Sequence, residues 1–425
     1  MTGSAEVAAV AARVFRDERG AVLATLIRQV GDFQLAEDSM QDAFESALAT
    51  WPRDGIPRNP AAWINVTARR RAIDRLRRNR SVADRAARLA ELIRLDEQEH
   101  PTTGEASMIA DDRLRLIFTC CHPALDPSAR VALTLRTLGG LTTAEIAHAF
   151  VVTEPTMGKR IARAKRKIAN AHIRYQVPAD DELPGRLRGV LRVVYLIFNE
   201  GYSASTGDRL TRGELCGEAI RLGRLLVELM PVEADAWGLL ALMLLHDARQ
   251  AARTDPGGYV ALTDQDRSLW NHAQIADGLR ALDRAVRFHR PGQYQLQAAI
   301  TALHIQAADP DATDWARIAD LYAALGRLSP SAVVEVNHAA AVGFAEGPQA
   351  GLDLLRPLLA VPALRQYQPL HAAHADLLNR AGDQPAAARA YQQAIALTQN
   401  AVTRAELQRR LDALRAGSPP SPAEH

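Results

Sequence analysis

The strongest constraint on the fold is a helical sequence pattern that runs through most of the chain. Ala, Leu, Arg and Glu dominate the 425 residues, and few stretches alternate apolar and polar residues with the period of two that strands require. Apolar residues make up 48% of the chain, and its length is enough for two or three domains with a sizeable core. The sequence therefore predicts an all-α fold.

Segments rich in proline, glycine or polar residues interrupt this pattern. WPRDGIPRNP (51–60) separates two helical segments, residues 81–110 have the composition of a linker, and QVPADDELPG (176–185) marks a further boundary. The tail, 416–425, has the composition of a disordered segment. We therefore expect domains at 7–80, 111–175 and 183–415.

Charge is distributed unevenly between the two parts of the chain. Residues 1–175 contain 27 Lys and Arg against 21 Asp and Glu, whereas residues 176–425 contain 24 against 28. A basic N-terminal part and a mildly acidic C-terminal part indicate different tasks for the two parts of the chain.

The apolar runs are too short to span a bilayer, and the N-terminus lacks a secretory-signal pattern. We therefore expect a cytoplasmic protein without a membrane partner.

Three cysteines, Cys120, Cys121 and Cys216, argue against a disulfide framework. The CCH run that ends at His122 lacks the second ligand pair of a zinc site, so packed free thiols are the favoured interpretation.

The sequence contains no P-loop, no Rossmann glycine pattern, no HExxH motif and no convincing pair of nucleophile and base. We therefore expect no enzymatic activity, no catalytic residue, no cofactor and no metal.

Residues 140–168 have the form of a helix-turn-helix. Thr142 and Glu145 form a capping box for the first helix, and Thr153 is a plausible N-cap for the second. The second helix has an apolar stripe, Met157, Ile161, Ala164 and Ile168, and no acidic residue occurs in 155–175. Such a helix suits a DNA groove, although a helix pair in another kind of bundle remains an alternative. The candidate DNA contacts are Thr156, Lys159, Arg160, Arg163, Lys165, Arg166 and Lys167.

A second basic stretch, TARRRAIDRLRRNR (67–80), contains seven arginines and one acid. It belongs to a predicted amphipathic helix at 61–78 with the apolar stripe Ile64, Ala68, Ala72, Ile73 and Leu76. Taken alone, this helix is compatible with a solvated face, a nucleic-acid surface or a membrane surface. Trp51 and Trp63 precede the basic stretch, and such rings either stack on unpaired bases or belong to the core. The candidate contacts are Trp63, Arg69, Arg70, Arg71, Arg75, Arg77 and Arg78.

The segment before it, 31–51, predicts an acidic amphipathic helix. Its expected buried stripe is Met40, Ala43, Phe44, Ala47 and Leu48. Its polar face is acidic, with Glu37, Asp38, Asp42 and Glu45. Because an acidic surface does not approach phosphate, we expect this helix to face a protein.

Three of these segments, in order, resemble an extracytoplasmic-function (ECF) sigma factor of the sigma-70 family. AEDSMQDAF, NPAAWINVTARRRAIDRLRR and LTTAEIA…TEPTMGKRIARAKRKI look like its regions 2.2, 2.3/2.4 and 4.2. The resemblance implies a dissociable RNA polymerase subunit that contacts the β′ clamp helices and the β flap of the core enzyme. Helix 63–78 would read the −10 promoter element and helix 155–167 the −35 element, while Arg70 stands where the family usually has Asn. The implied polymerase contacts are Glu37, Asp38, Gln41, Asp42 and Phe44.

The back of the chain shows weak helical repetition. In residues 371–400, Ala387, Tyr391 and Ala394 have the spacing of a tetratricopeptide (TPR) repeat, with Gly382 at the turn between two helices. GVLRVVYLIFNEGYSAS (189–205) resembles the ECF subgroup with a TPR-like extension, which implies that the extension regulates the factor through a protein partner or an intramolecular contact. A non-repeating bundle is the alternative fold, and a helix-turn-helix regulator with a TPR sensor is the alternative function. We also expect Gly201 to cap a helix end.

Overall fold

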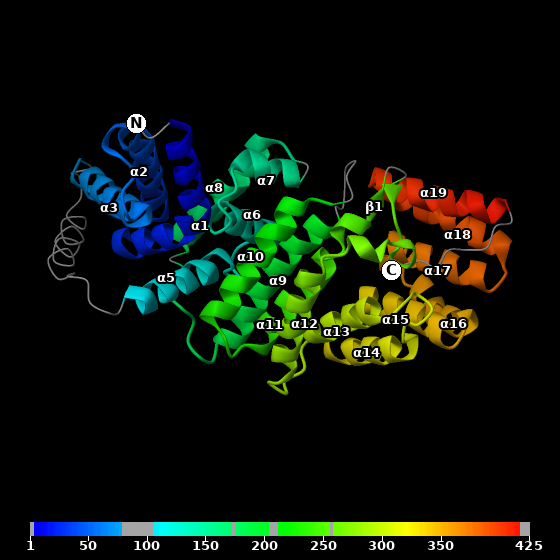
Figure 1. Ribbon diagram of the computed structural model, residues 1–425. Helices are drawn as coiled ribbons and strands as arrows, with labels where there is room; N and C mark the ends of the chain where they lie inside the picture. The colour runs from blue at the N-terminus through cyan, green and yellow to red at the C-terminus, as the bar shows by residue number, and fades with distance from the viewer. Residues whose placement is uncertain are drawn as a thin grey trace. The chain divides into compact units, whose positions relative to one another are not determined.

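The computed structural model describes residues 4–78, 105–150, 152–171, 173, 175–203, 211–255 and 258–416 (Figure 1). Within these ranges the regular structure is helical except for one antiparallel pair of two-residue strands, β1 (Thr254–Asp255) and β2 (Gly258–Tyr259). The all-α prediction is confirmed. The chain forms two compact units, Met1–Val194 and Tyr195–His425, and among the described residues no helix has the length and apolarity to cross a membrane.

Unit 1 begins with three helices that pack on one another, α1 (Ser4–Val30), α2 (Phe33–Asp54) and α3 (Pro60–Arg78). Asp32 caps α2 by accepting from the Leu35 N–H at 2.9 Å, and Asn59 Oδ1 accepts from the Ala62 N–H at 3.1 Å in the first turn of α3. The break predicted at 51–60 is shorter than expected, because α2 continues through Pro52 and ends before Gly55, which has a φ of 83°. Only glycine adopts such a φ without strain.

The buried stripe of α2 differs from the predicted one at its last position. Met40, Ala43, Phe44 and Ala47 are buried as expected, but Leu48 is 49% exposed. Trp51 lies one turn further along the helix and is 1% exposed. Eleven residues at about 100° each bring Trp51 back over Met40, whereas Leu48 lies at the edge of the stripe.

The second group of helices in unit 1 packs against the first. It contains α5 (Glu105–Cys120), α6 (Pro127–Thr137), α7 (Thr143–Ala149) and α8 (Glu154–Asn170), and α5 and α6 both contact α1. Residues 79–104 lie outside the described residues, and α5 already covers 105–110 of the expected linker. Arg28 of α1 pairs with Asp112 of α5 at 2.8 Å, and the Tyr175 hydroxyl lies 3.0 Å from the carbonyl oxygens of Ala24 and Asp112. These contacts join the two groups of helices into one unit.

Helix α9 (Leu183–Tyr202) begins in unit 1 and ends in unit 2. Gly201 is the last residue but one of this helix, so the helix ends where expected, but Gly201 is not among the glycines with positive φ and the predicted glycine cap is wrong. A Cβ on Gly201 would lie 2.7 Å from the Cys216 backbone nitrogen and 2.9 Å from its Sγ. Glycine is therefore required there by the close approach of α9 to the next helix, not by a left-handed backbone.

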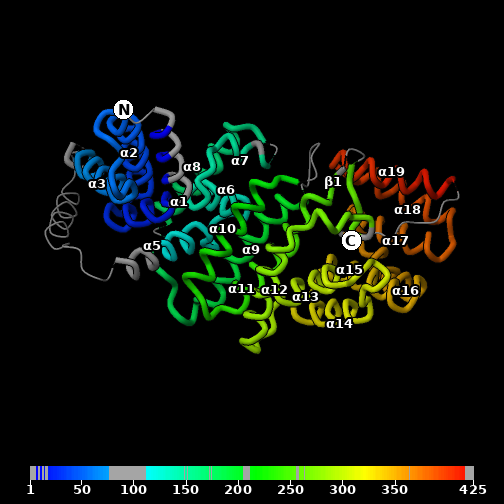
Figure 2. The backbone as a smooth tube through the Cα atoms, in the orientation of Figure 1, coloured from blue at the N-terminus to red at the C-terminus, as the bar shows by residue number. Residues whose placement is uncertain are grey.

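Unit 2 consists of successive helices that pack mainly on their neighbours in the chain (Figure 2). They are α10 (Gly213–Leu229), α11 (Ala234–Asp247), α12 (His272–Val286), α13 (Gln293–Gln306), α14 (Trp315–Leu328), α15 (Ala332–Ala345), α16 (Pro348–Leu359), α17 (Gln368–Arg380), α18 (Gln384–Leu397) and α19 (Ala401–Arg415). Short 3₁₀ helices occur at η1 (Gln250–Ala252), η2 (Leu262–Asp264), η3 (Arg267–Leu269) and η4 (Pro362–Leu364). Such an arrangement buries each apolar face only by stacking.

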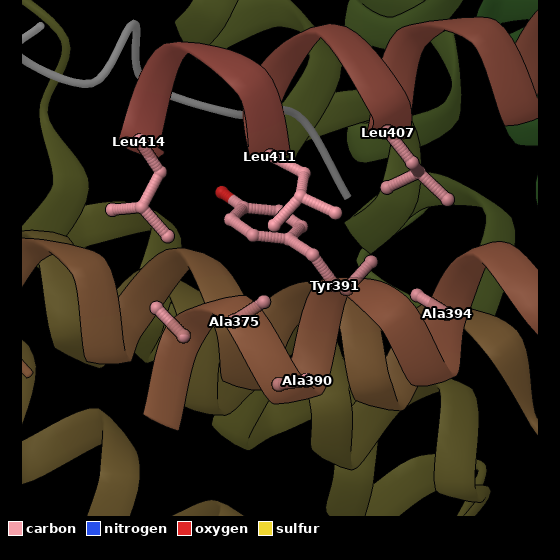
Figure 3. Close-up of a cluster of buried hydrophobic side chains, with 9 residues drawn as sticks. Ala375, Ala390, Tyr391, Ala394, Leu407, Leu411 and Leu414 are labelled. Carbon is pink, nitrogen blue, oxygen red and sulfur yellow. The ribbon is translucent and has the colours of Figure 1, made fainter. Parts of the chain in front are cut away.

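The helix pair predicted in 371–400 is confirmed by α17 and α18. Gly382 forms the turn between them with a φ of 85°, and Ala387, Tyr391 and Ala394 are buried. Figure 3 shows the Tyr391 ring lying between α18 and the leucines of α19, Leu407, Leu411 and Leu414. The Tyr391 hydroxyl donates to Asp376 of α17, so the buried phenol is satisfied. Of the tail predicted to be disordered, residues 417–425 lie outside the described residues.

Close helix packing in unit 2 gives a test with opposite outcomes at two helical glycines. A Cβ on Gly351 of α16 would lie 2.6 Å from the Ala339 carbonyl oxygen and 2.9 Å from the Gly343 Cα. We expect Gly351→Ala to lower the free energy of unfolding by about 1–3 kcal/mol, as overpacked sites do. Gly217 of α10 has no heavy atom within 4 Å of its Cβ position, so Gly217→Ala should raise it by about 0.5–1 kcal/mol. Urea unfolding of both variants measures the difference, and equal effects would contradict this account of the packing.

Candidate nucleic-acid interface

The helix-turn-helix of unit 1 forms as its capping residues predict. The Thr142 N–H donates to Glu145 Oε2 at 2.6 Å and the Glu145 N–H donates to Thr142 Oγ1 at 3.1 Å, which confirms the capping box before α7. Thr153 caps α8 by accepting from the Thr156 N–H at 3.4 Å. The predicted stripe is confirmed, because its four members are buried: Met157, Ile161, Ala164 and Ile168.

Burial of this stripe sets which cations of α8 face solvent. Counting about 100° per residue from Thr156, the residues at 159, 160, 163 and 167 lie within about 60° of it on the helix. Lys159, Arg163 and Lys167 are exposed, Arg166 beside them is exposed, and Arg160 is half-buried. The Thr156 hydroxyl lies 2.9 Å from that of Thr153. We call the surface formed by Thr156, Lys159, Arg160, Arg163, Arg166 and Lys167 the basic face of α8.

Lys165 does not belong to this face, which corrects its grouping with the other cations. Nine residues from Thr156 place it about half a turn around the helix, next to the buried stripe. Its side chain is 15% exposed and its Nζ contacts the carboxylate of Glu37 in α2. The same Nζ lies 3.5 Å from Gln34 Oε1 and 5.8 Å from the Phe33 ring centroid.

Glu37 also departs from the expected exposed acidic surface of α2. It is 6% exposed, and it pairs with Arg19 of α1 at 3.1 Å and with Arg136 of α6 at 3.4 Å, in addition to Lys165. Burial by itself raises the pKa of the Glu37 carboxyl, but Lys165 and then Arg19 and Arg136 together bring it below its ordinary value. The position of Glu37 on α2 is not by itself a signal for burial, because Leu48 lies within about 20° of it on the same helix and is exposed.

The arginines of α3 divide between solvent and α2. Arg70 is exposed, and Arg69 is half-buried. Arg71 is exposed but donates to Ser46 Oγ at 3.2 Å. Arg75 pairs with Asp42 at 2.7 Å and with Asp38 at 3.4 Å, so part of the basic run neutralises the acidic helix beside it. The side chains of Leu76, Arg77 and Arg78 lie outside the described residues.

Trp63 stands at the start of α3 and is half-buried. Its ring meets the fully buried Trp51 edge to face, with centroids 5.5 Å apart. Trp51 therefore belongs to the core, while part of the Trp63 side chain remains accessible to solvent. The core interpretation is confirmed for Trp51, and base stacking by Trp63 stays a prediction.

The remaining predicted contacts of α2 are unequally accessible. Gln41 and Glu45 are exposed and hydrogen-bonded to each other at 3.0 Å, whereas Phe44 is 8% exposed. The sequence prediction missed two exposed apolar side chains in this part of unit 1, Leu48 of α2 and Val66 of α3, which are 49% and 50% exposed. An apolar side chain left exposed on a charged helix is a signal for a contact surface.

The cysteines are buried free thiols, as the sequence favours. Cys120 Sγ lies 3.1 Å from the Thr137 hydroxyl and Cys121 Sγ lies 3.6 Å from that of Thr134. Burial raises the pKa of Cys121 to about 11, so its thiol is unreactive at neutral pH. In the described part of the chain, no group of three or more His, Cys, Asp or Glu side chains could hold a metal ion.

Comparison with known proteins assigns families to both units. Residues 14–82 match sigma-70 region 2, residues 115–168 match sigma-70 region 4, and residues 186–286 match a family of unknown function, DUF6596. The ECF RNA polymerase sigma factor SigK of Mycobacterium ulcerans is 26% identical over 153 residues, which is 35% of this chain and 78% of that protein. The probable ECF RNA polymerase sigma factor SigI of Mycobacterium tuberculosis is 27% identical over 159 residues, which is 37% of this chain and 54% of SigI.

A further relative matches along the whole length. The uncharacterized protein R00370 of Rhizobium meliloti is 42% identical over 427 residues, covering 100% of this chain and 98% of that protein. The chain therefore belongs to one family with R00370, and it carries the region 2 and region 4 domains of the sigma-70 family, whose members are not enzymes, ahead of a DUF6596 domain.

Proposed function

We propose that this protein is an RNA polymerase sigma factor that binds the core enzyme and directs promoter recognition and transcription initiation. The proposal rests on three surfaces that follow one another along unit 1. Helix α2 is partly acidic, and the basic helix α3 packs on it. The helix-turn-helix of α7 and α8 follows, with its basic face on α8. A helix-turn-helix regulator would explain α8 but would leave α2 and α3 without a task.

The basic face of α8 is suited to the major groove at the −35 element. Thr156, Lys159 and Arg160 lie in its first turns, where recognition helices contact base edges, and Arg163 follows one turn later on the same side. Arginine donates two hydrogen bonds to one guanine, and lysine neutralises phosphate. Arg163 would therefore supply specificity, while Lys167, further along the same face, would supply affinity through the DNA backbone.

Helix α3 is suited to the −10 element through its solvent side. Arg70 is exposed there, Arg69 is half-buried, and the Trp63 ring offers a stacking surface for an unpaired base at the start of the helix. Arg70 stands where the family usually has asparagine, so we expect the −10 base preference of this helix to differ from that of the family. Arg77 and Arg78 complete the proposed set from the sequence alone.

Core polymerase would dock on α2 through the side that remains accessible. Gln41, Asp38 and Asp42 provide polar contacts, and the exposed Leu48 provides an apolar one of the kind that anchors an interface. The β′ clamp helices are the proposed partner of this surface, and the β flap is that of region 4. Glu37 and Phe44 are buried here, so they would support the surface from within.

The extension in unit 2 is proposed to modulate the activity of the factor. The buried Ala387, Tyr391 and Ala394 and the turn at Gly382 support a TPR-like character for α17 and α18. TPR-like stacks present extended surfaces to protein partners.

Deleting the extension should therefore change the activity of the factor. Run-off transcription with core polymerase measures this activity for the full chain and for residues 1–194.

Arg163→Ala tests the specificity role of α8. Losing a bidentate contact to a base costs about 1–3 kcal/mol, so we expect initiation at a promoter with a matched −35 element to fall by about 5- to 150-fold. Arg356→Ala is the control, since it removes the same charge from an exposed site of unit 2. Core-dependent run-off transcription measures both, and an Arg163→Ala holoenzyme with normal promoter binding would show the assignment to be wrong.

Lys167→Ala tests the phosphate role of the same face. A lysine that neutralises one phosphate contributes about 1 to the slope of log affinity against log salt concentration. We expect the variant holoenzyme to lose that amount of slope and to bind matched and mismatched promoters more weakly by a similar factor. Titration at several salt concentrations measures the slope, and an unchanged slope would remove Lys167 from the DNA surface.

A further inference from the structure

Buried cations and aromatic rings come together in unit 2 around the 3₁₀ helix η1. Arg249 and Arg253 flank η1 and are 2% and 4% exposed. Both side chains reach Tyr202 in the last turn of α9, and Arg249 also reaches His246 near the end of α11. We call these four residues the Arg253 cluster. They lie within the segment that matches DUF6596, a family without a known function.

The positive charge of Arg253 is surrounded by neutral groups. Its Nη1 donates to the Tyr202 carbonyl oxygen, and its Cζ lies 3.5 Å from the centroid of the Tyr202 ring. Its Nε has no hydrogen-bond partner, and among the residues that the structure describes no carboxylate pairs with it. Burying a cation without a counter-charge is costly, so this site favours the arrival of an anion.

The acids closest in sequence are engaged elsewhere. Glu200 of α9 pairs with Arg212, and both side chains are largely buried, at 14% and 11% exposed. Asp247 of α11 accepts from Gln274 Nε2 at 2.8 Å. Burial raises the pKa of the Asp247 carboxyl and only the Gln274 hydrogen bond opposes this shift, so no cation neutralises Asp247. Neither acid therefore balances the charge of Arg253.

His246 adds no charge to the cluster, and it sets the direction of the hydrogen bonds. Burial, followed by Arg249 and Arg253, lowers the pKa of His246 well below its ordinary value, so the ring is neutral. Because arginine only donates, His246 Nδ1 accepts from Arg249 Nη2 at 3.3 Å and the ring proton is on Nε2. Nε2 then donates to the Thr301 hydroxyl at 3.2 Å, which donates to the Gln297 carbonyl oxygen at 3.0 Å.

Tyr202 is left with a hydrogen-bond donor to offer. Its hydroxyl oxygen accepts from Arg249 Nη2 at 2.9 Å, and within the described part of the chain no acceptor takes the phenolic proton. The ring is fixed in place by stacking on Phe198, with centroids 5.7 Å apart, and by edge contact with His246 at 4.8 Å. Tyr202 is half-buried, so the cluster reaches the protein surface on this side.

We propose that the Arg253 cluster binds an oxyanion, the carboxylate or phosphate group of a small molecule. The Nε side of the Arg253 guanidinium is part of the fork that pairs with two oxygens of such a group, and the Tyr202 hydroxyl supplies a further donor. The alternative is a structural role in which Arg253 only ties η1 to the Tyr202 carbonyl. The inference goes beyond the sigma-factor proposal and does not depend on it, because the site lies in unit 2 alone.

Isothermal titration calorimetry of the full chain tests the site with two probes, sodium phosphate and sodium succinate. Both titrations are made in Tris chloride buffer at constant ionic strength, so that chloride is the reference anion. We expect one probe to bind with one-to-one stoichiometry at millimolar concentration or below. Binding of phosphate identifies a phosphate-bearing ligand, and binding of succinate identifies a carboxylate.

Two variants of the cluster and one control make the test specific. Arg253→Met removes the guanidinium and should weaken binding by about 10-fold or more, as the loss of a charge-assisted hydrogen bond does. Tyr202→Phe keeps the ring and removes the hydroxyl, so binding should weaken by about 2- to 10-fold. Arg280→Met removes an exposed arginine of α12 that pairs with Asp277 of the same helix, and it should leave binding unchanged.

Thermal unfolding of the same variants separates binding from a structural role. In chloride buffer, Arg253→Met removes a buried charge that lacks a counter-charge, so its Tm should equal or exceed that of the wild type. The probe that binds should raise the Tm of the wild type more than that of Arg253→Met. Arg280→Met corrects for the general stabilisation that such salts give to folded proteins.

The outcomes decide between the two roles of Arg253. Failure of both probes to bind the wild type, or equal binding to wild type and folded Arg253→Met, would overturn the site. So would a lower Tm of Arg253→Met in chloride without any difference in its response to the probes. If Arg253→Met does not fold, Tyr202→Phe carries the comparison. None of these measurements uses core polymerase, so the sigma-factor proposal stands or fails separately.

Discussion

The buried stripe of α8 determines which side chains of this helix can serve as a DNA surface. Met157, Ile161, Ala164 and Ile168 pack inward, and this fixes the rotation of the helix about its axis. Once the rotation is fixed, the hydroxyl and cations at 156, 159, 160, 163 and 167 share the solvent side. Lys165 is directed toward α2 instead. A uniform run of positive charge thus becomes two surfaces with different partners.

Charged side chains of unit 1 form ion pairs between helices as well as facing solvent. Arg75 of α3 pairs with Asp38 and Asp42, and the Glu37 carboxylate lies among three cations. Partly exposed pairs such as those of Arg75 contribute little, typically below about 1 kcal/mol. A buried carboxylate is different, because removing its partners leaves an uncompensated charge at a cost of about 3–5 kcal/mol. The pairs that Glu37 makes with Arg136 and Lys165 are therefore buried ionic contacts between regions 2 and 4, beside the Arg28–Asp112 pair that also joins the two groups of helices.

Unit 2 follows a simpler principle, since each helix buries its apolar face on the next. Close approach is achieved with glycine at Gly343 and Gly351, and an aromatic ring fills the wider space at Tyr391. The same close approach explains Gly201, which we expected to cap the helix end and which instead packs against Cys216 in the last turn of α9. A glycine in a sequence signals a missing side chain, but the sequence does not say whether a turn or a neighbouring helix requires it.

Local sequence determined the all-α fold, the capping box at Thr142, the N-cap at Thr153, the stripe of α8 and the helix pair around Gly382, because each depends on residues within a few turns of one another. It did not determine the fate of Glu37 and Leu48, which are eleven residues apart and lie within about 20° on α2. The carboxylate is buried and the leucine is exposed, the reverse of their ordinary preferences. Only the tertiary structure decided this, because Arg19, Arg136 and Lys165 come from distant parts of the chain to surround the one position, and helix periodicity carries no information about what lies beyond the helix.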